Sequence, residues 1–230
     1  MNQHFAYFLI LFFSIAGPLA LSFDRKVRFY KKWRFLLPAT LLPALLYILW
    51  DIYFVSKEVW SFNDKYITGI KLFNLPIEEV TFFLIIPYCS IFIYECTCIY
   101  FTNCKNKKAG DTFLKVLAIV LMIAGIIFYD KYYTSWTFVF NSVFIGIIYC
   151  FRSYFKEFDA GSFVVAYLFT LIPFLIVNGL LTALPVVIYN NNENTGIRIY
   201  SIPFEDVFYG MLLVLFNIVI YEKLKYKNIA

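Results

Sequence analysis

"KLFNLPIEEVTFFLIIPYCSIFIYE", residues 71–95, joins two adjacent acids to an apolar run that is long enough to cross a membrane. A helix of about 20 apolar residues spans the hydrocarbon core of a bilayer. The stretch "RIYSIPFEDVFYGMLLVLFNIVIYE", residues 198–222, has the same design, with a proline, two acids and a closing Tyr-Glu. The sequence therefore contains a repeated unit that is built around a membrane-spanning helix.

The composition of the whole chain is that of an integral membrane protein. Of its 230 residues, 62% are hydrophobic and 15% are charged, far from the balance of a soluble domain. Seven apolar runs approach the length of a membrane span, at residues 4–23, 34–55, 76–101, 112–129, 132–151, 161–189 and 203–221. We therefore expect an all-α polytopic protein with seven transmembrane helices in a lipid bilayer.

The basic residues predict the direction of these helices. Fourteen lysines and arginines fall in loops on one side of the expected membrane and five on the other. Because such residues concentrate in short cytoplasmic loops, we expect the N-terminus outside and the C-terminus in the cytoplasm. The first run has no basic start, which favours a retained helix over a signal peptide. The net charge of +5 then reflects this topology and contact with anionic lipid, not a nucleic-acid partner.

An internal repeat organises the chain. Moving the sequence by 127 residues superposes residues 59–95 on 186–222 without a gap, with twelve identities. The same offset relates helices one to three to helices five to seven, although the first pair of helices is only faintly similar. One extra helix allows two three-helix units to run parallel in a membrane. We expect a 3+1+3 architecture, with repeats at 1–101 and 131–230 and a linker with the fourth helix at 102–130.

The acidic pairs lie where each third helix of a repeat begins at the outer face. A proline followed by acids is an ordinary helix start, favoured by the helix dipole. Recurrence of the pair and its depth in the membrane favour a functional role. Adjacent helical residues point about 100° apart, so one acid of each pair should face a central cavity shared by both halves. Asp51, which the offset pairs with Asn178, is expected to complete the acidic cluster.

Such a cluster suits proton chemistry on a hydrophobic substrate. Crowded carboxyl groups in a dry site repel one another, which leaves a neutral acid available near pH 7. An acid that protonates an alkene produces a carbocation, which carboxylates and aromatic faces stabilise. The sequence has no dinucleotide or P-loop motif, and neither His4 nor the five cysteines suggest a zinc site or a disulfide framework. We expect a redox-neutral isomerisation without a cofactor or metal.

Several motifs resemble one family: "WD" at 50–51, "VWSFNDKYITGI" at 59–70, "LPIEE" at 75–79, "NNENTGIR" at 191–198 and "IPFED" at 202–206. Together they resemble the membrane-integral lycopene cyclase family of bacteria, archaea and fungi, in its fused form, over nearly the whole chain. The resemblance implies proton-initiated closure of rings at the ends of lycopene or of longer C50 carotenoids. It also implies a carotenoid as the binding partner and an enzyme in a bacterial inner membrane.

The resemblance also implies roles for individual residues. The family's P-x-E-[E/D] motif falls on Pro76, Glu78 and Glu79, and again on Pro203, Glu205 and Asp206. Glu78 and Glu205 are the leading candidates for the acid. The other acids are expected to stabilise the cation or to accept the proton that is lost at the end: Glu79, Asp206 and Asp51. The carbon that loses this proton decides whether a β, ε or γ ring forms. The residues expected to shape the outer cavity are Trp50, Trp60, Asn63, Tyr66, Asn178, Asn190, Asn194 and Arg198.

Other functions remain open at this stage. SWEET sugar carriers share the parallel 3+1+3 plan, although paired acids in an apolar site fit a hydrophobic substrate better than a sugar. A retinal photoreceptor requires a lysine in the seventh helix, and the run at 203–221 has none. A purely structural subunit would keep costly acids in the membrane without using them. The sequence leaves the ring type, the length of the substrate and the oligomeric state open.

Overall fold

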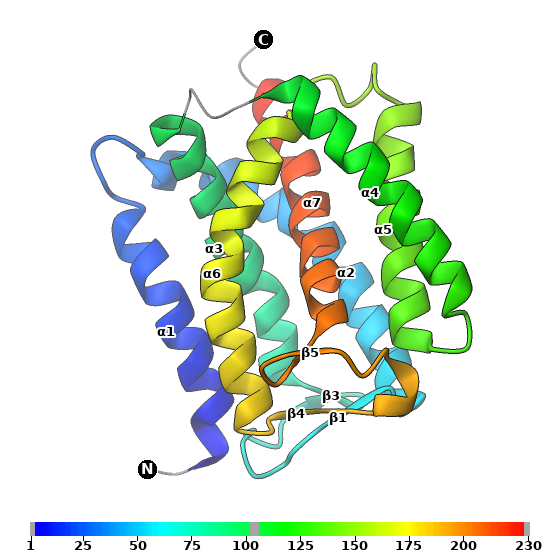
Figure 1. Cartoon of the computed structure of the whole chain (residues 1–230). Coiled ribbons are helices and arrows are strands. Elements are labelled where there is room, and N and C mark those ends of the chain that lie inside the picture. The colour runs from blue at the N-terminus through cyan, green and yellow to red at the C-terminus, as the bar shows by residue number, and fades with distance from the viewer. Residues whose placement is uncertain (1–2, 102–105, 228–230) are drawn as a thin grey trace.

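The computed structural model of the chain describes residues 3–101 and 106–227. In this part of the chain, seven helices are long and apolar enough to cross a membrane, which confirms the expected all-α polytopic fold (Figure 1). A helix of 24 residues such as α2 reaches about 36 Å, more than the roughly 30 Å of a hydrocarbon core. The helices are α1 (Ala6–Leu21), α2 (Trp33–Ser56), α3 (Ile77–Tyr100), α4 (Lys107–Ile127), α5 (Tyr132–Cys150), α6 (Ala160–Ala183) and α7 (Phe204–Lys227).

Three of these helices differ by five or more residues from their apolar runs, and one of them, α7, continues to Lys227, beyond the run at 203–221. The run at 161–189 predicts one helix, but α6 ends at Ala183 because Pro185 cannot continue it, and the β-branched residues beyond form a strand. Helix α4 begins at Lys107, before the apolar run at 112–129, because Asn106 caps a polar first turn and accepts a hydrogen bond from the Ala109 amide at 3.0 Å. Residues 102–105, where the expected linker starts, lie outside the described residues.

Short strands close one end of the helical bundle. Strand β1 (Trp60–Phe62) follows α2, and strand β4 (Val187–Tyr189) follows α6. They pair antiparallel, so that Trp60 faces Tyr189, Ser61 faces Ile188 and Phe62 faces Val187. Because Ser61 and Ile188 are 127 residues apart, the two strands are equivalent under the sequence offset. This sheet therefore joins the two halves of the chain around a pseudo-two-fold axis.

The loops that follow also repeat in detail. Hairpin β2–β3 (Lys71–Leu72, Leu75–Pro76) leads into α3, and hairpin β5–β6 (Arg198–Ile199, Ile202–Pro203) leads into α7. Each hairpin turn contains one residue with positive φ, Phe73 at 56° and Tyr200 at 59°. Gly69 and Gly196, just before the hairpins, have φ values of 83° and 76°, which glycine adopts without strain.

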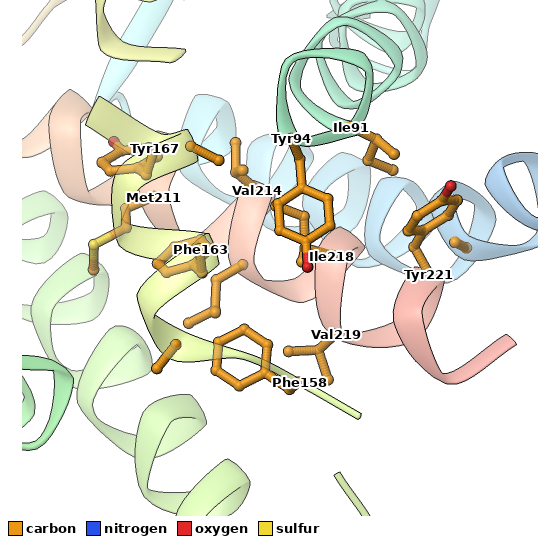
Figure 2. Packing of buried hydrophobic residues seen from close by; sticks show 14 of the residues in the cluster. Ile91, Tyr94, Phe158, Phe163, Tyr167, Met211, Val214, Ile218, Val219 and Tyr221 are labelled. Atoms are coloured by element: carbon orange, nitrogen blue, oxygen red, sulfur yellow. The ribbon is translucent and has the colours of Figure 1, made fainter. Parts of the chain in front are cut away.

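Helices α3 and α7 form the centre of the bundle. Helix α3 packs against α1, α2 and α6, while α7 packs against α2 and α5 and also touches α3 and α6. Helix α4 lies on the outside, against α5 and α6. Toward the end of the bundle away from the strands, apolar side chains from α3, α6 and α7 pack together, as Figure 2 shows for Ile91, Phe163 and Ile218. This core fixes the helices that carry the acids.

One ion-pair cluster crosses this same end. The Glu95 side chain is only 3% exposed and accepts hydrogen bonds from Lys32, from Lys225 at 2.8 Å and from the Tyr221 hydroxyl at 2.7 Å. Lys225 also reaches Glu222 at 3.0 Å. Since a buried carboxylate needs compensating charge, these contacts tie the start of α2 and the end of α7 to α3.

Candidate active site

A small cavity of about 50 Å³ lies between the two halves, next to the β1–β4 sheet. Three acids line it: Asp51 from α2, Glu79 from α3 and Asp206 from α7. Their residues are 2%, 8% and 2% exposed, so the carboxyl groups are removed from water. The structure thus brings together one acid of each repeated pair and the expected third acid. The same lining contains Asn178, the residue that the offset pairs with Asp51.

Glu79 is held by a tyrosine from the first helix. The Tyr7 hydroxyl donates a hydrogen bond to Glu79 Oε2 at 2.5 Å, and both groups are buried. Tyr7 itself is fixed at the start of α1, where its amide donates to the Tyr66 carbonyl at 3.2 Å. The oxygen that Tyr7 contacts is thereby oriented, while the carboxyl group still borders the cavity.

Asp206 has three hydrogen-bond donors around it. Tyr133 donates to Oδ1 at 2.5 Å, and Tyr189 and the Asn178 amide donate to Oδ2 at 2.9 and 3.2 Å. Burial raises the pKa of the Tyr189 phenol well above its usual value, and the nearby Asp206 carboxyl raises it further. Tyr189 therefore stays protonated at neutral pH and acts as a donor to Asp206.

Asp51 is contacted from the opposite half of the chain. The Tyr209 hydroxyl of α7 donates to Asp51 Oδ1 at 2.5 Å. Tyr47, one helical turn before Asp51, donates from its hydroxyl to the Tyr209 carbonyl at 3.0 Å. These bonds cross from α2 to α7 and hold Asp51 against the cavity.

The remaining walls are mostly aromatic. Eight aromatic side chains line the cavity together with the three acids. Tyr133 and Tyr189 stack with ring centroids 5.8 Å apart, and Trp60 packs edge-on against Tyr133 at 5.2 Å. Among the described residues, no lysine, arginine or histidine contributes to this lining. The aromatic residues are Tyr7, Trp60, Phe62, Phe82, Tyr133, Phe174, Tyr189 and Tyr209.

Glu78 and Glu205, the leading sequence candidates for the acid, point elsewhere. Glu78 Oε1 accepts the Thr68 amide at 2.7 Å, and Glu205 Oε1 accepts the Thr195 amide at the same distance. Glu205 Oε1 also accepts the Thr134 hydroxyl at 2.7 Å. Both residues are fully buried, but neither lines the acid cavity. Their contacts tie the outer loops to the first turns of α3 and α7.

The predicted binding residues divide into two groups. Trp60 and Asn178 line the cavity, and Trp50 lies behind it, with its ring 5.2 Å from that of Tyr209. Asn63, Asn190 and Asn194 accept backbone amides from residues two positions later, as in turns that asparagine stabilises. These three asparagines therefore order the loops around the site.

Tyr66 and Arg198 also belong to the loops. Tyr66 packs with the apolar residues beside α1 and receives the Tyr7 amide at its carbonyl oxygen. The Arg198 guanidinium donates to the Asn191 side chain and lies 5.7 Å from the Tyr189 ring centroid. Arg198 thus makes no ion pair with Glu205 or Asp206 in the described structure.

The sequence did not single out the tyrosines that hold the acids. Tyr7 and Tyr133 occupy corresponding places at the starts of α1 and α5 but are 126 residues apart, one fewer than the repeat offset. The available signal for Tyr189 and Tyr209 is that both are hydroxyl donors that flank the second acidic motif in the sequence. In the described residues, no three or more His, Cys, Asp or Glu side chains are placed so that they could hold a metal ion, and Cys104 lies outside these residues.

Comparison with known proteins identifies related sequences. A family model described as lycopene cyclase matches residues 4–97 and 130–224, which leaves out the whole of α4. A bifunctional lycopene cyclase/phytoene synthase of Neurospora crassa is 30% identical over 81 residues, covering 33% of this chain and 14% of the relative. The protein of the same name from Aspergillus niger is 35% identical over 84 residues, with the same two shares.

A shorter match is closer in sequence. The bifunctional lycopene cyclase/phytoene synthase of Leptosphaeria maculans is 40% identical over 47 residues, which cover 20% of this chain and 8% of the relative. The chain thus spans only about a seventh or less of the length of these relatives. No solved structure matches the chain.

Proposed function

Because the chain belongs to the lycopene cyclase family, we propose that it is a carotenoid cyclase that closes rings at the open ends of lycopene. The observation that carries this proposal is the buried cavity lined by Asp51, Glu79 and Asp206 and by eight aromatic side chains. Acids supply and remove protons, and aromatic faces stabilise a cation.

The proposed reaction is balanced in protons and electrons. A carboxylic acid adds its proton to the terminal double bond of the substrate, which leaves a tertiary carbocation. The electron pair of an internal double bond attacks this cation and forms the ring bond, which moves the positive charge onto the ring. A carboxylate then removes a proton from a carbon next to the charge and restores a double bond. One proton enters and one leaves, so the reaction is an isomerisation by an intramolecular lyase.

We assign the proton steps to the three cavity acids. Glu79 and Asp206 are related by the repeat, and both face the cavity from the first turn of a central helix. Asp51 completes the set and faces them from α2. The tyrosines orient these carboxyl groups: Glu79 and Asp51 each accept one hydroxyl on one oxygen, whereas Asp206 accepts donors on both. Glu78 and Glu205 are proposed to fix the loops that cover the site.

The setting of the enzyme follows from its helices and charges. Its apolar helices place it in a lipid bilayer. We propose that the strands and the acid cavity lie toward the outer face, since most lysines and arginines occur in the loops at the opposite end. This corresponds to a bacterial inner membrane with the C-terminus in the cytoplasm. The 3+1+3 division is proposed on the matching hairpins and on the two stretches recognised by the family model.

The direct test is pigment analysis of bacterial cells that accumulate lycopene and express this chain. We expect ringed carotenoids on chromatography, and none from a matched E79Q/D206N double variant that accumulates to the same level in the membrane. If well-expressed wild-type protein leaves the lycopene unchanged, the same assay in cells that accumulate open C50 carotenoids decides whether the substrate is longer. Unchanged pigment in both hosts would refute the cyclase function.

A further inference from the structure

The acid cavity is too small for the end of the proposed substrate. Its volume of about 50 Å³ has room for only a few water molecules, at roughly 10–15 Å³ each, whereas a cyclohexene ring with its methyl groups contains many more atoms. A carotenoid is also insoluble in water, so it must arrive from the hydrocarbon core. Some side chain has to move, and some path has to connect the cavity with lipid.

Two further hollows lead from the acid cavity to the lipid-facing surface. A hollow of about 140 Å³ between α1, α3 and α6 shares Ile86, Phe174 and Asn178 with the acid cavity. It also shares Ser14, Pro173 and Val177 with a groove of about 540 Å³ between α1 and α6. The outer groove is lined by side chains such as Phe13 and Ile176, which are 72% and 61% exposed on helices that cross the membrane. The three hollows therefore lie in a row from the acid cavity to the lipid-facing surface, and each adjoining pair is separated only by the side chains that it shares.

The pseudo-symmetric position in the other half holds a groove that stops short of the acids. This groove, about 470 Å³ in volume, lies between α2, α5 and α7 and shares no lining residue with the acid cavity among the described residues. Tyr47 and Trp50 close its inner side, packing at 4.9 and 5.2 Å on the Tyr209 ring. By the 127-residue offset, their counterparts in the open path are Phe174 and Val177.

Tyr47 is held by contacts that its counterpart Phe174 lacks. The Tyr47 hydroxyl is tethered to the Tyr209 carbonyl, and its ring packs 5.5 Å from that of Phe83. Phe174 has no hydroxyl, and the counterpart of Phe83 is Gly210. A Cβ atom on Gly210 would lie 2.7 Å from the Phe174 ring, so this ring packs directly against the backbone of Gly210. Val177, in place of Trp50, leaves the path beside Phe174 open.

We propose that the polyene substrate reaches the acids sideways from the bilayer, between α1 and α6, with Phe174 as the gate and Val177 as the residue that keeps the path open. This inference rests on the proposed function for the identity of the substrate. When Phe174 swings away from Gly210, the hollow at α3 and the acid cavity merge. The end of the polyene then lies beside Asp206 and Asn178 while the rest of the chain remains in the groove.

The first test copies the closed half into the open one. V177W places there the tryptophan that occupies the equivalent position in α2, and it should lower the rate of ring formation at least about tenfold. I172W is the matched control, since Ile172 is a lipid-exposed residue of α6 that does not line the path. It should cyclise lycopene at the wild-type rate. Equal rates in the wild type and V177W, at equal protein levels, would refute the path.

The second test starts from a cysteine that the protein already has and does not require turnover. Cys89 lines the intermediate hollow, so lycopene in proteoliposomes should slow its alkylation by N-ethylmaleimide, measured by mass spectrometry. Exposed Cys150 is the internal control. F216C probes the equivalent position in the closed groove, where lycopene should give no protection. Protection at Cys89 without ring formation would support the path and overturn the cyclase function, whereas ring formation without protection would overturn the path alone.

Discussion

The two halves of this molecule agree closely in their loops and differ around the cavity. In the loops, Glu78 and Glu205 accept the amides of Thr68 and Thr195 at the same distance, and the Ile77 and Phe204 amides bond to equivalent carbonyl groups. Around the cavity, Asp51 corresponds to Asn178, Phe83 to Gly210 and Trp50 to Val177. The two repeats therefore have the same loop structure but different cavity-lining residues, so a symmetrical scaffold surrounds an asymmetrical site.

This contrast separates two kinds of acid in one short motif. The first acid of each pair bonds to its own loop, while the second faces the shared cavity. The two cavity acids also have different surroundings, because Glu79 has one tyrosine donor and Asp206 has two tyrosines and an amide. We infer that the first acids, Glu78 and Glu205, hold the loops in place, and that the second acids, Glu79 and Asp206, take part in the proton transfers.

The largest expected effect tests this separation. E79Q and D206N should each lower the rate of ring formation about 10²–10⁴-fold, because an amide cannot transfer the proton that a general acid or base moves. E78Q should remain within about tenfold of wild type, since its side-chain oxygen still accepts the Thr68 amide. Rates per amount of membrane protein, measured by chromatography, check both expectations. A larger loss of rate in E78Q than in E79Q would mean that Glu78, and not Glu79, transfers the proton.

The next effect concerns Glu95 and Glu222, which are equivalent in sequence but not in their contacts. Among the described residues, Glu95 pairs with both Lys32 and Lys225, whereas Glu222 pairs with Lys225 and bonds to Tyr94. Breaking a fully buried ion pair costs about 3–5 kcal/mol. E95A should lower the free energy of unfolding by the low end of this range or less, because both lysine side chains are about a quarter exposed. Unfolding in mixed detergent measures the free energy, and E222A should lose clearly less. Equal losses would contradict the asymmetry.

A smaller effect is expected from truncating the loop acids. E78A leaves the Thr68 amide without its acceptor, which costs about 1–3 kcal/mol for a buried donor. E205A should cost more than E78A, since Glu205 also accepts the Thr134 hydroxyl and so joins α5 to α7. The same unfolding assay compares the two variants, with the Gln variants as controls that keep the acceptor. Stability unchanged in E78A would show that this bond does not hold the loop.

Much of the frame could be predicted from the sequence, because membrane helices follow from length and hydrophobicity alone. The offset of 127 residues also anticipated that one acid of each pair would face a shared cavity, since helical geometry separates neighbours by about 100°. Which of the two faces inward could not be read from the sequence. In the fold, the Thr68 and Thr195 amides, which lie in the loops just before the two hairpins, bond to the first acid of each pair.

The end of α6 and the tyrosine donors escaped prediction for related reasons. An apolar run does not distinguish a helix from a buried strand, so residues 187–189 were included in a helix although they pair with residues 60–62. Tyr7 and Tyr133 lie in the pair of helices where the repeat is faintest. The chain also has many other tyrosines, so the sequence does not distinguish these two. Only tertiary packing shows which hydroxyl groups reach the acids.

The smallest expected effect tests how far the loops are equivalent. G69A and G196A each force a side chain into the left-handed region, at φ values of 83° and 76°, which costs about 1 kcal/mol. A Cβ atom at either position meets no atom within 4 Å, so the cost is confined to the backbone and should be equal in the two halves. Each loop covers an acid that is fixed in the same way, so ring formation should fall by the same small factor in both variants. A large loss in one variant only would mean that the two loops, alike in structure, serve the cavity unequally.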